Sequence, residues 1–329
     1  MAKYVKISLL LFLSFIGLYY AFKSINFSVL LEHLYAVNSF KFFLSIFILI
    51  ISCIIRSRRL KYLAAPIDKT ISTHHLFGAT MIGYFGNGIL FFRLGELLKA
   101  YAISQGRKIK PSESFGLIML ERLLDALTVF SLLVLTLPFL PLGNQMIRYW
   151  IIGFVIVTLT FIWILFFSKF LNWASLISYL GFLNEPLKNK ILDVIEKVYN
   201  GLGLVFKTKN KVEILICTFL IWLCYYFMTI CLIESCNINM TLLDSFIILI
   251  MGAIIISVPA FPGGLGTYEA GITYALTLLY FVPKDMALTY AIVSHTSNYL
   301  PYIIIGAFYF IKSGMKISSI NNISVNYES

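Results

Sequence analysis

Charged residues are scarce in this chain: of its 329 residues, only 12% are Asp, Glu, Lys or Arg, whereas soluble domains contain about 25%. Hydrophobic residues make up 60% of the chain, and the mean hydropathy is +0.88. The interior of a water-soluble fold could not bury this excess. The composition therefore excludes a soluble protein and predicts an integral membrane protein.

Motifs that carry enzymatic chemistry are also scarce. The sequence contains no metal-ligand spacing, phosphate-binding loop or activated-nucleophile motif. Three of the five cysteines, Cys217, Cys224 and Cys231, recur every seven residues without polar partner ligands nearby, a spacing typical of small packing residues in a helix seam. The sequence thus predicts no metal and no cofactor, and it favours transport over catalysis.

Eight apolar runs are long enough to cross a bilayer, which takes roughly 17–25 residues. They lie near 7–22, 40–55, 114–138, 149–167, 212–233, 243–258, 267–282 and 288–311. The first follows a basic start but lacks a small-residue cleavage site, so we expect it to remain as a span. Residues 76–92 are apolar but short and glycine-rich, which favours a re-entrant or broken segment. The expected fold is all-α and polytopic, with about eight transmembrane helices.

Lysine and arginine are distributed unevenly between the predicted loops. If the N-terminus is cytoplasmic and 76–92 does not cross, 21 of the 26 lie on the inner side, four lie outside and Arg122 lies within a span. Cytoplasmic loops normally hold this excess. We therefore expect a multi-pass protein of the cell inner (plasma) membrane with both termini in the cytoplasm. Because topology explains the basic loops, no nucleic-acid partner is expected. An amphipathic helix on the cytoplasmic surface is predicted near 185–206.

Polar residues interrupt the apolar pattern at 85–101. An ionisable group at bilayer depth costs roughly 2.5–3.5 kcal/mol and usually faces a cavity or a partner. Arg93 and Glu96 are three residues apart, a spacing at which helical side chains can pair. Gly95 loosens the backbone and Asn87 offers an amide. The cluster fits either an ion pair at the interface or a headgroup site in which the guanidinium holds phosphate.

A second cluster, Glu121, Arg122 and Asp125, lies inside a predicted span. The two carboxylates share one helix face, and Arg122 is spaced to pair with Asp125. One cation cannot neutralise two carboxylates, so an outside partner is expected, with Arg93 as a candidate. The cluster fits either a structural ion-pair group between helices or part of a polar site, and in an enzyme Glu121 and Asp125 could serve as an acid/base pair.

The third cluster is a break at 258–269, where prolines remove backbone donors and glycines permit unusual dihedral angles. Unpaired backbone survives at membrane depth only if it is buried in protein or lines a wet cavity. A new helix is expected to begin near residue 267, and its first turn attracts anions. The residues singled out here are Pro262, Gly263, Gly264, Gly266 and Glu269.

Glu269 could be a simple helix-start carboxylate, a proton carrier or a counter-charge to a cationic headgroup. In the last span, His295 could relay protons or form an interhelical hydrogen bond, with Asn298 in the same polar cluster. Broken segments near 76–96 and 258–269 recur in the two halves of the chain, and such breaks are the best sequence indication of a transporter's binding site.

The three motifs, in this order, resemble the lysylphosphatidylglycerol synthase transmembrane family, also called the flippase-like domain family. Its hallmarks are R-x-G-E, E-R-x-x-D and P-G-G-x-G-x-x-E, which match 93–96, 121–125 and 262–269. The resemblance implies one transmembrane domain over 1–329 that moves an aminoacylated phospholipid between leaflets. In two-part members a separate C-terminal domain performs lysyl transfer. Since this chain ends after the last span, the resemblance implies a stand-alone member without that domain, for which a lysyltransferase activity is not expected to carry over.

The leading hypothesis is a translocator for an anionic or aminoacylated phospholipid or a lipid-linked glycan precursor, whose headgroup would be anionic or zwitterionic. The alternatives are a membrane transferase for lysyl or glycosyl groups and a non-catalytic protein of envelope assembly. A second copy of the chain and an envelope biosynthesis enzyme are the other candidate partners. No catalytic residue is assigned. The candidate binding or translocation residues are Asn87, Arg93, Gly95, Glu96, Glu121, Arg122, Asp125, Pro262, Gly263, Gly264, Gly266, Glu269, His295 and Asn298.

Overall fold

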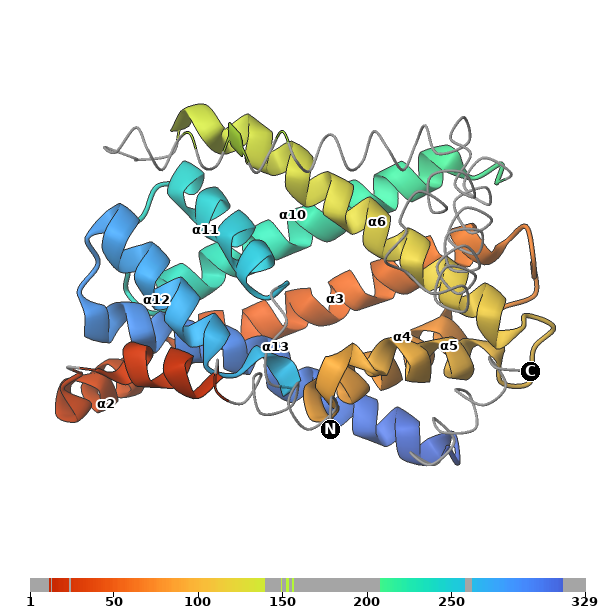
Figure 1. Ribbon diagram of the computed structural model, residues 1–329, viewed down its shortest axis with the longest axis horizontal. Helices are drawn as coiled ribbons and strands as arrows, with labels where there is room; N and C mark the ends of the chain where they lie inside the picture. The colour runs from red at the N-terminus through yellow and green to blue at the C-terminus, as the bar shows by residue number, and fades with distance from the viewer. Residues whose placement is uncertain are drawn as a thin grey trace, which may run out of the picture.

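The computed structural model describes residues 12–139 apart from 13 and 24, four positions between 149 and 156, and residues 208–257 and 262–315. Every regular element in these residues is helical (Figure 1), which confirms the expected all-α fold. The predicted span 149–167 is described at four positions only, and the predicted amphipathic helix near 185–206 lies outside the described residues.

Four long helices form the frame of the molecule. They are α3 (Ser39–Ala64), α6 (Pro111–Thr136), α10 (Lys211–Ser235) and α13 (Lys284–Lys312). Helices α3 and α10 are antiparallel: Lys41 pairs with Glu234 at 2.8 Å at one end, and the Thr208 hydroxyl donates to the Tyr62 carbonyl at 3.2 Å at the other. By length and apolar composition, both α3 and α10 can cross a membrane. The helix Ser14–Phe22 and α2 (Phe27–Tyr35), bent by 90°, would together supply a third span.

The segment expected to be broken near 76–96 forms a helical hairpin. Helix α4 (Thr73–Ile89) is followed by the short 3₁₀ turn η1 (Phe91–Arg93) and by α5 (Gly95–Ser104). The backbone turns where Arg93 adopts a left-handed conformation, with φ 54°. The two arms are antiparallel, and the His75 ring contacts the Ile103 carbonyl at 3.0 Å near their open end. This α4–α5 hairpin therefore starts and finishes at the end of the frame where α3 terminates.

A second hairpin contains the break near 258–269. Helix α11 (Leu242–Ile255) and α12 (Thr267–Tyr280) are its arms, and the 3₁₀ turn η4 (Pro262–Gly264) lies between them. The turn needs glycine, because φ is 74° at Gly263, 81° at Gly264 and 85° at Gly266. The sequence predicted separate spans at 243–258 and 267–282. Each arm has 14 residues, about 21 Å at 1.5 Å per residue, which is shorter than the roughly 30 Å hydrocarbon core.

The two hairpins enter the frame from opposite ends, and their turns meet in the middle. The α11–α12 hairpin starts and finishes where α3 begins, whereas the α4–α5 hairpin does so where α3 ends (Figure 1). The turns η1 and η4 are in contact, and α13 packs against both α4 and α12. Residues 256–266 contain no lysine or arginine. If the two expected spans form one hairpin instead, no lysine or arginine moves from one side of the membrane to the other.

Gly95 allows the arms of the α4–α5 hairpin to touch, which generates a stability prediction. A methyl group at Gly95 would overlap the Gly83 carbonyl and the Asn87 amide, and overpacking of this kind costs about 1–3 kcal/mol. We expect Gly95→Ala to lower the melting temperature of the purified protein in detergent. The matched control is Gly252→Ala, where the nearest atom is the Ile272 Cδ1 at 3.6 Å and alanine favours the helix. Equal melting temperatures for the two variants would contradict the close packing.

Candidate functional site

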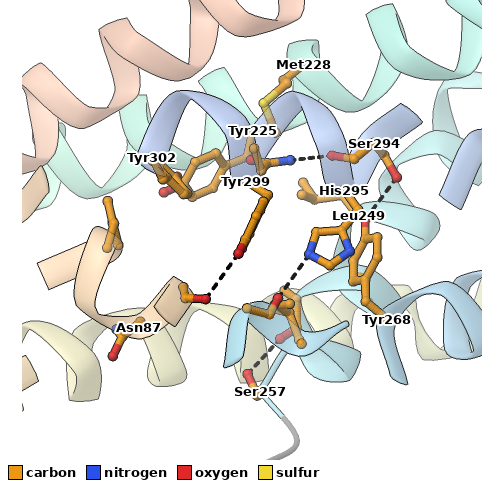
Figure 2. A pocket seen from close by; sticks show the side chains of 18 of the residues that line it. Asn87, Tyr225, Met228, Leu249, Ser257, Tyr268, Ser294, His295, Tyr299 and Tyr302 are labelled. Carbon is orange, nitrogen blue, oxygen red and sulfur yellow. Dashed lines mark hydrogen bonds between the residues drawn. The ribbon is translucent and has the colours of Figure 1, made fainter. Parts of the chain in front are cut away.

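A cavity of about 630 Å³ lies where the two turns meet. Its walls come from the ends of α4 and α11, the turn η4, the middle of α10 and α13, and Arg122 of α6. Figure 2 shows Tyr299 between Asn87 and His295 in this cavity. The candidate residues that line it are Asn87, Arg93, Glu96, Arg122, Pro262, Gly263, Gly264, His295 and Asn298. The remaining five, Gly95, Glu121, Asp125, Gly266 and Glu269, do not line it.

Arg93 is the charged group at the junction of the two hairpins. Its Nη2 donates to the carbonyl of Ile256, the residue that follows α11, at 2.6 Å. Within the part of the chain that the structure describes, Arg93 forms no ion pair with a carboxylate. Of the two alternatives for this cluster, the Arg93–Glu96 ion pair is therefore not formed, because η1 directs Arg93 towards the other hairpin. A guanidinium that donates to a neutral carbonyl can still bind an anion through its other N–H groups.

Arg122, rather than Arg93, neutralises Glu96. Its Nη2 lies 2.7 Å from Glu96 Oε1, which also accepts a hydrogen bond from the Asn87 side-chain amide at 3.2 Å. The expected pairing of Arg122 with Asp125 is likewise wrong, since Arg122 points towards α5. The three side chains join α4, α5 and α6 on one wall of the cavity. The second carboxylate oxygen of Glu96 has no hydrogen-bond partner among the described residues.

Glu121 and Asp125 belong to a buried ion-pair cluster behind that wall. Arg56 Nη1 contacts Glu121 Oε1 at 2.8 Å and Asp125 Oδ2 at 2.7 Å. Arg59 Nη2 lies 2.7 Å from Asp125 Oδ1, and Lys99 Nζ lies 2.6 Å from Glu121 Oε2. The side chains of all five are at most 14% exposed. Cations outside the triplet neutralise these carboxylates, as expected. They are Arg56, Arg59 and Lys99, and not Arg93, the candidate that the sequence suggested.

The sequence pattern does not predict Arg56, Arg59 and Lys99 as members of this cluster, because it places all three in a cytoplasmic loop. In the structure α3 continues to Ala64, so Arg56 and Arg59 lie on a helix, and Lys99 lies on α5. One signal was available: Arg56 and Arg59 are three residues apart, which places them on one helix face. If the helix extends past residue 55, the side chains of Arg56 and Arg59 lie on the same side and can bind one partner.

The formal charges around this wall do not cancel. Three cations face two carboxylates in the buried cluster, which leaves one positive charge. Arg122 and Glu96 balance each other, and Arg93 adds a second positive charge. Arg56 also donates to the Tyr225 hydroxyl at 2.9 Å, and Tyr225 lines the cavity. The wall is therefore basic, with an excess of two formal charges.

The opposite side of the cavity carries a carboxylate–imidazole pair. His295 Nδ1 lies 2.5 Å from Glu269 Oε1, and His295 Nε2 lies 2.9 Å from the Gly263 carbonyl. The other oxygen of Glu269 accepts the Gly266 backbone N–H at 2.7 Å, as a first-turn carboxylate does at a helix start. His295 thus links the turn η4 to the beginning of α12. The structure thus contains the helix-start contact that is one alternative for Glu269 and the interhelical hydrogen bond that is one alternative for His295.

The rest of the lining is aromatic and aliphatic. The rings of Tyr84 and Tyr302 are 4.2 Å apart between centroids, and the Tyr299 hydroxyl donates to the Gly88 carbonyl at 3.1 Å. The aromatic lining residues are Tyr84, Trp222, Tyr225, Tyr268, Tyr290, Tyr299 and Tyr302. The cavity is thus amphipathic: one wall is basic and the others are largely apolar. Such a hollow suits a ligand with an anionic head and an apolar remainder.

These features define a helical membrane protein in which two opposed hairpins enclose a basic, amphipathic cavity. The chain belongs to the lysylphosphatidylglycerol synthase TM region family, whose model matches residues 5–306. It is similar to the UPF0104 membrane protein MJ1595 of Methanocaldococcus jannaschii, with 25% identity over 244 residues that cover 68% of this chain and 70% of the relative. No solved structure matches the chain.

The buried cluster generates a prediction about charge removal. Glu121→Gln would leave three buried cations facing one carboxylate, and breaking a buried ion pair costs about 3–5 kcal/mol. We expect this variant to lose most of its folded protein or to melt at a much lower temperature in detergent.

The matched control is Glu234→Gln, which breaks the exposed pair with Lys41. Exposed pairs contribute about 1 kcal/mol or less, so this variant should melt close to wild type. A Glu121→Gln protein as stable as the Glu234→Gln protein would show that the cluster does not hold the helices together.

Proposed function

We propose that the protein is a lipid translocator, which binds the anionic headgroup of a membrane lipid in the cavity and moves that lipid between leaflets. The proposal rests on one observation above all: Arg93, a cation without a carboxylate partner in the described residues, stands where two opposed hairpins meet around a cavity. The proposal places the protein in the cell inner membrane with both termini in the cytoplasm.

The charge of the cavity supports an anionic headgroup. A guanidinium recognises phosphate by two parallel hydrogen bonds, and Arg93 has donors beyond the one bound to the Ile256 carbonyl. The excess charge of the buried cluster adds an attractive field from behind Tyr225. Glu96, whose side chain lines the cavity and is 13% exposed, could accept a hydrogen bond from an ammonium or hydroxyl group on the same headgroup. Aminoacylated phospholipids and lipid-linked glycans both carry such groups next to a phosphate.

The arrangement of the hairpins supports movement rather than binding alone. Interrupted helices that meet near the membrane midplane are typical of transporters, where each half can open the site to one side. The α4–α5 hairpin reaches the cavity from one end of the frame and the α11–α12 hairpin from the other. A headgroup held between the turns could leave towards either leaflet, while its apolar tails stay in the bilayer.

The transferase alternative gains no support from the geometry. The acid/base pair that the sequence suggested, Glu121 and Asp125, does not line the cavity, and both carboxylates are held by Arg56. The test of this alternative is to incubate the purified protein with lipid acceptors and labelled lysyl or glycosyl donors. Formation of a labelled lipid would favour a transferase and overturn the assignment.

The proposed site predicts the effect of removing Arg93. In proteoliposomes, an NBD-labelled phosphatidylglycerol should move between leaflets faster with wild type than without protein, as measured by dithionite quenching of the outer leaflet. A hydrogen bond to a charged group contributes about 1.5–3 kcal/mol, so Arg93→Ala should slow movement about tenfold or more. Arg93→Lys keeps the charge but loses the fork, and we expect an intermediate rate.

The control is Arg58→Ala, which removes an exposed arginine of α3 that contacts Tyr62 and does not line the cavity. Its rate should equal that of wild type, and both variants should elute as folded protein. NBD-labelled phosphatidylcholine reports on selectivity for the anionic headgroup. Unchanged movement of the anionic probe in a folded Arg93→Ala protein would exclude Arg93 from the site.

A further inference from the structure

We infer that Glu269 and His295 form a proton-binding site, and that its proton ties the turn η4 to α13. The inference starts from the two contacts of the His295 ring, with Glu269 Oε1 at 2.5 Å and with the Gly263 carbonyl at 2.9 Å. Neither partner is exposed: the side chains of Glu269 and His295 are each 8% accessible. His295 nevertheless lines the cavity, so a proton can reach the pair from there.

The two contacts of the His295 ring determine how many hydrogens the pair holds. A carbonyl oxygen only accepts, so the contact with Gly263 requires a hydrogen on His295 Nε2. The short contact between His295 Nδ1 and Glu269 requires one more hydrogen between them, because two lone pairs would otherwise face each other at 2.5 Å. The pair therefore holds two hydrogens, one more than a neutral imidazole and an ionised carboxylate would bring.

Loss of that extra proton forces a choice between the two contacts. A neutral imidazole carries a single N–H, which can point to Glu269 or to Gly263 but not to both. A hydrogen bond to an ionised carboxylate is roughly twice as strong as one to a neutral carbonyl. The remaining hydrogen therefore stays on Nδ1 against Glu269, and the Gly263 carbonyl loses its donor. Deprotonation thus releases the turn from α13 while the start of α12 stays capped through Gly266.

Among the described residues, the surroundings offer no charged group that would fix the protonation state. The titratable side chains that pack on the pair are Tyr268, with ring centroids 5.0 Å from His295, and Tyr299, at 5.7 Å. The Tyr268 hydroxyl is bound to Ser294, and the Tyr299 hydroxyl to the Gly88 carbonyl. In the described residues, the α11 arm and η4 bring no charged side chain to this side. The charged groups of the cavity stand on the basic wall: Arg93, Glu96 and Arg122.

The site matters for the proposed function because η4 forms part of the cavity wall. If the cavity moves lipid, as proposed above, a proton that ties or releases this turn would couple lipid movement to pH. The proton site itself does not depend on the proposed translocation, and its test needs no lipid transport.

The test is NMR of the protein labelled with ¹⁵N-histidine in lipid nanodiscs. The chain has four histidines, and the signals of His295 are assigned by their loss in His295→Gln. Near pH 6 we expect both ring nitrogens of His295 to carry hydrogen. As the pH is raised to 10, the signal should change to a neutral ring protonated on Nδ1. His74→Gln, which removes a histidine bound to Tyr309, is the control and should leave these signals in place.

A second variant separates the proton site from a fixed structural bond. Glu269→Gln keeps the shape of the side chain but removes the negative charge that attracts the proton, so the change of the His295 signals should occur at a lower pH than in wild type. The inference is overturned if His295 is singly protonated on Nε2 in wild type, if its signals do not change between pH 5 and 10, or if Glu269→Gln leaves the pH of that change unaltered.

Discussion

Backbone groups at interrupted helices have no water to bind at bilayer depth, so the protein itself has to satisfy them. Three carbonyls beside the breaks are held by side chains from elsewhere: Gly88 by Tyr299, Ile256 by Arg93 and Gly263 by His295. Each of these bonds joins two different elements. The side chains that complete the broken backbone thus also join the two hairpins to each other, through Arg93, and to α13, through Tyr299 and His295, and all three line the cavity. This constraint explains why polar residues occur in so apolar a chain.

Buried charge follows from the same arrangement. Two carboxylates on α6 draw three cations from α3 and α5 into the interior, and the cost of desolvating them is offset by mutual contacts of 2.6–2.8 Å. The cluster fixes α6 against the α4–α5 hairpin, which sets the position of Arg122 and hence of Glu96. Its surplus positive charge makes one wall of the cavity basic. Structure and electrostatics of the site therefore depend on the same five side chains.

Much of this could be predicted from the sequence, because glycine, proline and misplaced charge are local signals. The breaks before Glu96 and Glu269 were visible in this way, as was the need for outside partners to Glu121 and Asp125. The pairing itself was not visible. Spacing along one helix suggested Arg93–Glu96 and Arg122–Asp125, but η1 turns Arg93 away and α5 brings Glu96 to Arg122. Such contacts depend on how hairpins pack, which no local pattern encodes. The apolar runs at 243–258 and 267–282 likewise matched spans in composition, although the turn between them makes one hairpin.

The central claim, that two opposed hairpins enclose a basic pocket for an anionic headgroup, is tested most directly by an experimental structure in nanodiscs containing phosphatidylglycerol. The account predicts density for a phosphate within hydrogen-bond distance of the Arg93 guanidinium, between η1 and η4. A map in which the two turns are separated, or in which lipid headgroups occupy only the outer rim while the cavity beside Arg93 is empty, would contradict it.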